Sequence, residues 1–268
     1  MRSTILSLLL LGLATNAGAT GRHWPQLYKK GWSGSVSYSA GLSELSVGGE
    51  NHDAEATPRS HTVSANVRYN PVTEWYARVT VVAYVDRDRQ QVWDPDFTYG
   101  FGYSNWRPGT WSVTYENYGG NCFRCTGGNP STRILEGAIS ANYKLPVKKG
   151  PVSGSLSAQA VPRFFNLSAG DRQWLKTSMS AEVRVKVRER WYAGGRATFY
   201  PIQGQQQPWD PDFTYSMGYS DWRPGTFSVE YSNYAPNRFP GRSSGRPTTF
   251  RDGSLTITYK FPTGAGKK

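Results

Sequence analysis

Four aspartates stand in two identical Asp-Pro-Asp motifs, which are the clearest candidates for chemistry in this chain. The motifs are Asp94-Pro95-Asp96 and Asp210-Pro211-Asp212, preceded by Trp93 and Trp209. Paired carboxylates can act as acid and base, or they can bind Ca²⁺ through oxygen ligands. A proline also favours extended geometry in the residue before it, so each motif equally fits a rigid junction between a loop and a strand. We expect the structural role, with contact to a sugar or an ion at the rim as the alternative.

Both motifs belong to a longer internal repeat. The segments 93–118 and 209–234 are identical at 20 of 26 positions, at a constant offset of 116. The similarity continues outside these segments, since "EWYAR" at 74–78 matches "RWYAG" at 190–194. The repeat therefore spans about half of the chain, and the motifs are corresponding parts of two structural halves.

Alternation of side-chain type indicates that each half consists of β-strands. Along "FTYGFGY" at 97–103, every odd position is aromatic and every even position is small. Alternation with a period of two places one set of side chains on each face of a strand. Twelve segments are read as strands on this basis: 33–42, 60–69, 75–85, 96–104, 109–118, 135–145, 151–161, 177–187, 191–200, 211–220, 225–234 and 252–261.

The connections between these segments alternate between short turns and long loops. The expected long loops are 43–59, 86–95, 119–134, 162–176, 201–210 and 235–251. The apolar face carries aromatic residues near the strand ends, for example Trp75, Trp111 and Trp191. Such a pattern is typical of a membrane barrel with aromatic girdles, whereas a water-soluble sandwich would bury its apolar face between two sheets.

The N-terminus and the charge narrow the compartment and the partners. Met1-Arg2, an apolar run over 5–13 and Ala17-Gly18-Ala19 predict a secretory signal peptide. The net charge of +12 is compatible with anionic lipids or anionic solutes, and because the chain is exported we expect no nucleic-acid partner. In an exported chain, the only two cysteines, Cys122 and Cys125, are most simply read as a short-range disulfide. We expect no metal and no cofactor.

These features together resemble those of Gram-negative outer-membrane β-barrel proteins. The last segment, "GSLTITYKF" at 253–261, is similar to the C-terminal insertion signal of that class, although Phe261 is not the terminal residue. The resemblance implies an all-β transmembrane antiparallel barrel of about 12 strands in the outer membrane, surrounded by lipid and inserted by the outer-membrane assembly machinery. The expected segments are a signal peptide (1–19), a periplasmic N-terminal segment (20–32), half-barrels 33–146 and 147–262 forming one domain, and a tail (263–268).

If the apolar set faces lipid, the opposite set lines the lumen and is rich in positive charge. The basic residues of this set are Arg68, Arg78, Lys144, Arg184, Lys186, Arg196 and Lys260, against Glu116, Glu182 and Glu230. Two interpretations remain open. The charges can form a salt-bridged plug, or the basic surplus can line a path for anions, because rings of arginine and lysine favour anionic solutes in pores.

The leading functional hypothesis is a narrow channel for an anionic solute, such as an acidic oligosaccharide or an exported polysaccharide, and not an enzyme. The alternative is a non-conducting surface barrel that acts as adhesin, receptor or assembly partner through its long loops. A lesser alternative is a lipid-modifying enzyme of the outer membrane, for which His61 is the only histidine expected at a strand end. Its sequence context lacks the motif expected of an outer-membrane phospholipase, so we expect no catalytic residue.

Overall fold

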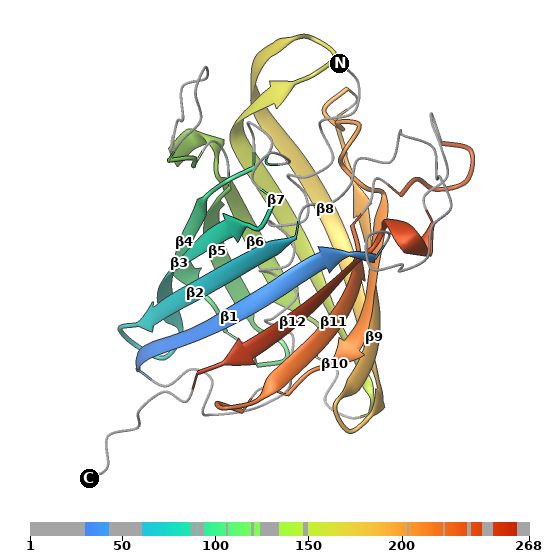
Figure 1. Cartoon of the computed structure of the whole chain (residues 1–268). Coiled ribbons are helices and arrows are strands. Elements are labelled where there is room, and N and C mark those ends of the chain that lie inside the picture. The colour runs from blue at the N-terminus through green and yellow to red at the C-terminus, as the bar shows by residue number, and fades with distance from the viewer. Residues whose placement is uncertain are drawn as a thin grey trace, which may run out of the picture.

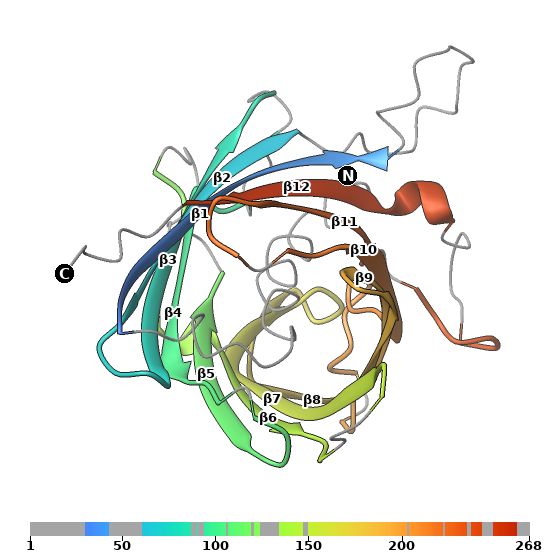
Figure 2. The same cartoon turned by 90° about the horizontal axis from the view of Figure 1, so that it is seen from below.

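Twelve strands form a closed antiparallel barrel in the computed structural model of this chain (Figures 1 and 2). Each strand pairs with its neighbours in sequence, and β12 pairs with β1 to close the sheet. The structure describes residues 30–42, 61–86, 90, 94–105, 107–118, 121–123, 134–146, 150–202, 204–221, 223–234, 237–242 and 249–261. The predicted signal peptide and C-terminal tail lie outside these residues.

The strands agree closely with the twelve segments expected from the sequence. They are β1 (Gly31–Gly41), β2 (Thr62–Asn70), β3 (Trp75–Tyr84), β4 (Phe97–Tyr103), β5 (Trp111–Asn117), β6 (Ala138–Lys144), β7 (Val152–Asn166), β8 (Asp171–Arg188), β9 (Trp191–Phe199), β10 (Phe213–Tyr219), β11 (Phe227–Asn233) and β12 (Ser254–Lys260). Two short 3₁₀ helices, η3 (Ile134–Glu136) and η4 (Phe250–Asp252), precede β6 and β12. No helix among the described residues is long and apolar enough to cross a membrane.

Side chains alternate between an apolar exterior and a more polar interior. In β3, Trp75, Val79 and Val81 are exposed on the outside, while Tyr76 and Thr80 are buried on the inside. An apolar face that meets the surroundings while polar groups turn inward is the reverse of a water-soluble barrel. The closed sheet also pairs every strand edge, as a hydrocarbon environment requires. The fold is therefore that of an outer-membrane β-barrel, which confirms the class expected from the sequence.

A girdle of aromatic pairs surrounds the end of the barrel where the short turns lie. Its members are direct cross-strand partners with ring centroids 4.7–5.8 Å apart, namely Trp32–Tyr69, Trp75–Tyr103, Trp111–Tyr143, Trp191–Tyr219 and Phe227–Tyr259. Amphipathic rings of this kind prefer the boundary between apolar and aqueous layers. The girdle thus marks one edge of the apolar belt, and we call this end of the barrel the turn end and the opposite one the loop end.

The expected long loop 162–176 is wrong, because the chain forms strand there instead. β7 continues to Asn166 and β8 begins at Asp171, so that the two strands form a hairpin that rises above the rest of the wall (Figure 1). Pro162 lies within this extended part of β7, although proline cannot donate a hydrogen bond to a ladder. In the structure the register passes from Val161↔Lys176 to Arg163↔Trp174, so Pro162 occupies a rung without a pair.

Equivalent contacts recur in the two halves at the sequence offset of 116. The Tyr115 hydroxyl donates to the carbonyl of Ile134 at 2.9 Å, and the Tyr231 hydroxyl donates to that of Phe250 at 2.7 Å. Gly137 and Gly253 lie beneath these rings, where a Cβ atom would come within 2.5 Å of ring atoms. Each tyrosine therefore packs over a glycine backbone and connects a 3₁₀ helix to the outer wall, a known way of securing a strand end.

Candidate functional site

The seven basic residues predicted to line the lumen all lie on interior-facing positions. Each is half-buried, in strands whose alternate residues are exposed on the outside. Lys144 and Lys260 are the last residues of β6 and β12, at the turn end. Arg68, Arg78, Arg184 and Lys186 lie within the same end of their strands, while Arg196 lies at mid-height in β9. We call this set the basic belt.

Hydroxyl and amide side chains cover the interior between the basic belt and the loop end. They bond across neighbouring strands, as in Ser37–Thr258 at 2.9 Å, Ser39–Thr256 at 3.0 Å, Asn66–Thr80 at 2.7 Å and Ser157–Ser180 at 3.2 Å. Such short neutral groups satisfy one another and fill little volume. The interior is thus layered, with a neutral polar wall above a cationic layer.

In the first half, the belt contains a compact ion pair. Arg78 Nη2 lies 2.7 Å from Glu116 Oε1, and the Tyr76 hydroxyl donates to the same oxygen at 3.1 Å. Gly100 provides the room for this carboxylate, because a Cβ atom there would lie 2.0 Å from Glu116 Oε2. The Arg68 guanidinium stacks 4.0 Å from the centroid of the Tyr76 ring. The carboxylate is therefore enclosed by protein donors.

The second half repeats the stacking but rearranges the charges. Arg184 stacks 3.4 Å from the Tyr192 centroid, and the Tyr192 hydroxyl donates to Glu230. At the offset of 116, the counterpart of Glu116 is Ser232, whereas Glu230 corresponds to Thr114. The carboxylate has therefore moved by two residues along its strand while the stacked Arg–Tyr pair stays in place.

One change between the halves leaves space at the position equivalent to Arg78. Its counterpart is Gly194, and a small cavity of about 30 Å³ lies beside this glycine, lined among others by Arg184, Arg196 and Tyr234. This is room for about two water molecules. Arg196 borders the cavity while its Nη2 lies 2.5 Å from Glu182 Oε2. In the second half, Arg184 and Arg196 thus line a cavity at the position that the first half fills with its own ion pair.

In the structure, basic side chains outnumber acidic ones on the interior face of the strands. Seven basic side chains of the belt share the interior with three glutamates, which leaves a formal excess of four positive charges. Glu116 and Glu182 each contact an arginine, and Glu230 accepts from Tyr192. The salt-bridged plug and the path for anions both stay predictions for this layer.

One belt residue connects to an ionic cluster at the turn between β10 and β11. Lys260 Nζ donates to the Asp221 carbonyl at 3.0 Å. The Asp221 carboxylate itself lies 2.8 Å from Arg190 Nη1 and 2.7 Å from Arg223 Nη2. The hydrogen bond from Arg223 lowers the pKa of Asp221, against the opposing effect of burial. The turn-end mouth is therefore ordered by charge pairs next to the basic belt.

The Asp-Pro-Asp motifs join loops to strands at the loop end. Asp212 is fully buried, and its carboxylate accepts from Gln206 Nε2 at 2.7 Å and from the Phe239 amide at 3.0 Å. The counterpart Asp96 accepts from Gln90 Nε2 at 2.7 Å and from the Phe123 amide at 2.7 Å. Each carboxylate thus ties the loop before its strand to the segment after the next strand.

The first aspartate of each motif is also buried, with 1% of Asp94 and 6% of Asp210 exposed. Among the described residues, no group of three or more His, Cys, Asp or Glu side chains is arranged to hold a metal ion. Trp209 is half-buried, and Trp93 lies outside the described residues. Contact with a sugar or an ion stays an untested prediction, and the hydrogen bonds give both motifs a structural role.

Sequence reasoning missed the side chains that organise these clusters. Tyr76 and Tyr192 share the interior face with the arginines, so the period-two alternation contained the signal for them. Gln90 and Gln206 gave no such signal, since both stand in loops. Cys122 is disulfide-bonded, as expected, but Cys125 lies outside the described residues. His61 Nδ1 lies 2.5 Å from the Tyr38 hydroxyl beside the first residue of β2.

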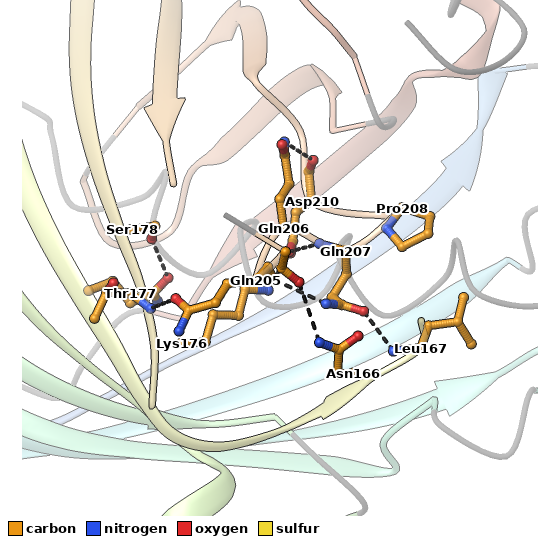
Figure 3. Close-up of polar contacts among 12 residues, drawn as sticks. Asn166, Leu167, Lys176, Thr177, Ser178, Gln205, Gln206, Gln207, Pro208 and Asp210 are labelled. Carbon is orange, nitrogen blue, oxygen red and sulfur yellow. Dashed lines mark hydrogen bonds and ion pairs between the residues drawn. The ribbon is translucent and has the colours of Figure 1, made fainter. Parts of the chain in front are cut away.

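A further polar cluster supports the tall β7–β8 hairpin (Figure 3). Lys176 pairs with Asp210, and Gln205 bonds to the backbone of β8 by accepting from the Thr177 amide at 3.0 Å and donating to the Leu175 carbonyl. Gln207 Oε1 accepts from the Leu167 amide at 2.8 Å. Beyond the end of β9, the backbone of the hairpin therefore bonds to glutamine side chains of the segment between β9 and β10 instead of to a neighbouring strand.

Comparisons with known proteins give little beyond the architecture. No protein-family model matches the chain, and no curated protein matches it. A solved structure similar to it is that of the NanC porin in a rhombohedral crystal form, with 12% sequence identity and a TM-score of 0.46. The match covers 87% of this chain and 100% of the porin chain. The fold assignment rests on the closed hydrogen-bonded ladder of the chain itself.

Proposed function

We propose that this protein is an outer-membrane channel for a small or extended anionic solute, with an acidic oligosaccharide as the favoured class. The observation that carries the proposal is the basic belt, in which seven interior cations, most of them near the turn end, share the interior face with three glutamates. A cationic layer in a narrow pore raises the local concentration of anions and repels cations. Above it, hydroxyl groups offer the neutral hydrogen bonds that sugar hydroxyls require.

Arg68 and Arg184 are the side chains best placed to discriminate between anions and cations. Each guanidinium is held over a tyrosine ring, which fixes its position. The two residues correspond at the offset of 116 and so place equivalent charges in the two halves of the wall. A carboxylate that passes through the pore can bind first to one of these fixed charges and then to the other, without any covalent chemistry.

Single-channel recording in planar lipid bilayers tests this proposal. We expect anion selectivity in a KCl gradient, and partial block by an acidic oligosaccharide at concentrations where a neutral one of equal length has no effect. The double variant Arg68→Gln with Arg184→Gln should shift the reversal potential towards that of a non-selective pore. Arg107→Gln, at an exposed turn outside the interior, is the matched control and should behave as wild type. Absence of conductance by folded protein, or cation selectivity, would contradict the proposal.

The second candidate, a non-conducting surface barrel, is favoured by one observation. The interior face of β3–β5 is fully packed, since Tyr76, Thr80, Thr98 and Glu116 are all buried. If the whole lumen were filled in this way, the loop end would carry the function by binding a partner. Folded protein without conductance in the experiment above would select this candidate, and deletion of residues 43–59 should then abolish binding and leave the barrel intact.

A further inference from the structure

In the β7–β8 hairpin, the alternation between inward-facing and outward-facing residues is reversed above the position where Pro162 lies opposite Leu175. Below this position, Met179 is 56% exposed on the outside while Ser178 and Ser180 face the interior. Above it, Phe164 and Asn166, which belong to the outer set by their position, are 8% and 6% exposed. Leu175 has a φ of 56°, the left-handed region that a non-glycine residue rarely adopts, and so provides the local twist.

The reversal turns one face of the hairpin towards the neighbouring segment 204–207. Asn166 donates to the Gly204 carbonyl at 3.4 Å, and Gln207 accepts from the amide of Leu167. Lys176, paired with Asp210, lies 5.9 Å from the centroid of the Phe164 ring. Figure 3 shows this packed side of the hairpin, with the Asn166 side chain and the Leu167 amide facing the glutamine segment.

The opposite face carries two arginines and two aromatic residues, which we call the Arg/aromatic patch. Arg163 faces Trp174 across the two strands, and Phe165 faces Arg172, so that cations and rings alternate in both directions. Trp174 is 67% exposed and Phe165 is 47% exposed. The Arg163 guanidinium lies 5.5 Å from the Trp174 centroid, and its Nε atom is buried and has no hydrogen-bond partner within the described part of the chain.

This patch lies on the outer side of the wall and continues the apolar belt. Arg172 forms an ion pair with Glu136 of η3 at 3.0 Å, and the carbonyl of Ile134 in η3 is bound by the hydroxyl of Tyr115. Tyr115 stacks on Phe101, which is exposed on the exterior, so η3 is an exterior element. Exposed apolar residues lie between the apolar belt and the patch: Ile139 in β6 and Met179 in β8 below it, Ile134 and Leu135 in η3, and Leu175 beside Trp174.

From this continuity and charge we infer that the Arg/aromatic patch binds the phosphorylated headgroup of a lipid in the leaflet on the loop side. Guanidinium groups bind phosphate through charge-assisted and often bidentate hydrogen bonds. Exposed tryptophan and phenylalanine suit the boundary between acyl chains and headgroups. A soluble acidic sugar would pair with the arginines but would not cover the apolar residues between the patch and the apolar belt. The inference requires a membrane around the barrel and is independent of conduction.

Native mass spectrometry of the whole protein in neutral detergent tests this binding. The probes are a bisphosphorylated lipid A, the same lipid without phosphates, inorganic phosphate, and a soluble acidic oligosaccharide. Wild type should retain bisphosphorylated lipid A in preference to the dephosphorylated form. In the double variant Arg163→Gln with Arg172→Gln, the affinity should fall by at least about tenfold, since both charge-assisted contacts are lost. Trp174→Ala should weaken binding of both lipid forms.

Arg251→Gln provides the matched control, because this arginine is exposed in η4 at the same end of the barrel. It should bind lipid as wild type does, and all variants should keep the circular dichroism of the folded barrel. Equal binding of the two lipid forms, or undiminished binding by the double arginine variant, would overturn the inference. So would binding of the acidic oligosaccharide through the same arginines without any lipid binding, and that result would identify a saccharide-docking face instead.

Discussion

At the scale of single residues, Asp221 shows how a charge contributes to the turn end, because its counterpart in the first half, Asn105, cannot ionise. The hydrogen bond from Arg223 lowers the pKa of Asp221, and the nearby charge of Arg190 acts in the same direction. A carboxyl whose pKa is lower in the folded state stabilises the fold above its unfolded pKa of about 4. That stabilisation is lost as the pH falls through the folded-state pKa. Asp221→Asn should therefore be less stable than wild type at pH 7, and the difference should vanish in strong acid.

Thermal unfolding in detergent micelles, followed by circular dichroism across this pH range, measures the effect. Asp171→Asn is the control, since Asp171 is exposed in the tall hairpin at the opposite end and its unfolding curve should follow wild type throughout. A difference between Asp221→Asn and wild type that stays constant with pH would show that the ionised carboxylate is not the cause. Contact of Arg223 with the acidic residue of its own turn could be expected from the sequence. The part of Arg190 could not, because Arg190 and Asp221 are 31 residues apart and meet only through the β9–β10 register.

At the scale of elements, the Asp-Pro-Asp motifs determine how loops attach to the wall. Asp212 is buried and accepts hydrogen bonds from segments on both sides of the β10–β11 hairpin. In Asp212→Asn, an amide nitrogen would face one of these donors. We expect the free energy of unfolding to fall by about 1–3 kcal/mol, the range for a buried donor left without its acceptor. Urea unfolding in detergent measures the change, and limited proteolysis should show faster cleavage after β11.

Asp96→Asn should reproduce this loss, since its bonds to Gln90 and Phe123 are the counterparts of those of Asp212. An unchanged urea midpoint in both variants would refute the structural role and restore the prediction of a ligand contact at the rim. The positions of the motifs were predicted correctly from proline geometry. Their partners were not, because loop glutamines and backbone amides carry no periodic signal. The left-handed backbone at Leu175 was missed for a similar reason, since a leucine gives no indication of a positive φ.

At the scale of the whole molecule, the two halves have similar sequences but divide the interior differently. The first half fills its wall with the Arg78–Glu116 pair, while the second leaves a cavity beside Gly194. Alternation and the repeat predicted the number of strands, the girdle and the set of interior cations, because each depends on local pattern. They did not predict that most of these cations share one layer, since that depends on where each strand meets the turn end. Function is therefore expected to need both halves together.

Closure of the barrel makes this dependence testable. Each half alone would expose two strand edges, and unpaired edges are unstable in hydrocarbon and prone to association. The halves meet at two seams, β6 with β7 and β12 with β1, and the second seam has seven residue pairs from Ser35↔Lys260 to Gly41↔Ser254.

We expect that a chain cut in the turn between Pro146 and Gly150 refolds in detergent when both fragments are present. The folded complex should resist dissociation in SDS until heated, and it should conduct with the anion selectivity of the intact chain. Neither fragment alone should give a heat-modifiable monomer. A stable folded monomer from residues 33–146 or 147–262 alone would refute the single-domain barrel, and a refolded complex without conductance would count against the channel and leave the fold untouched.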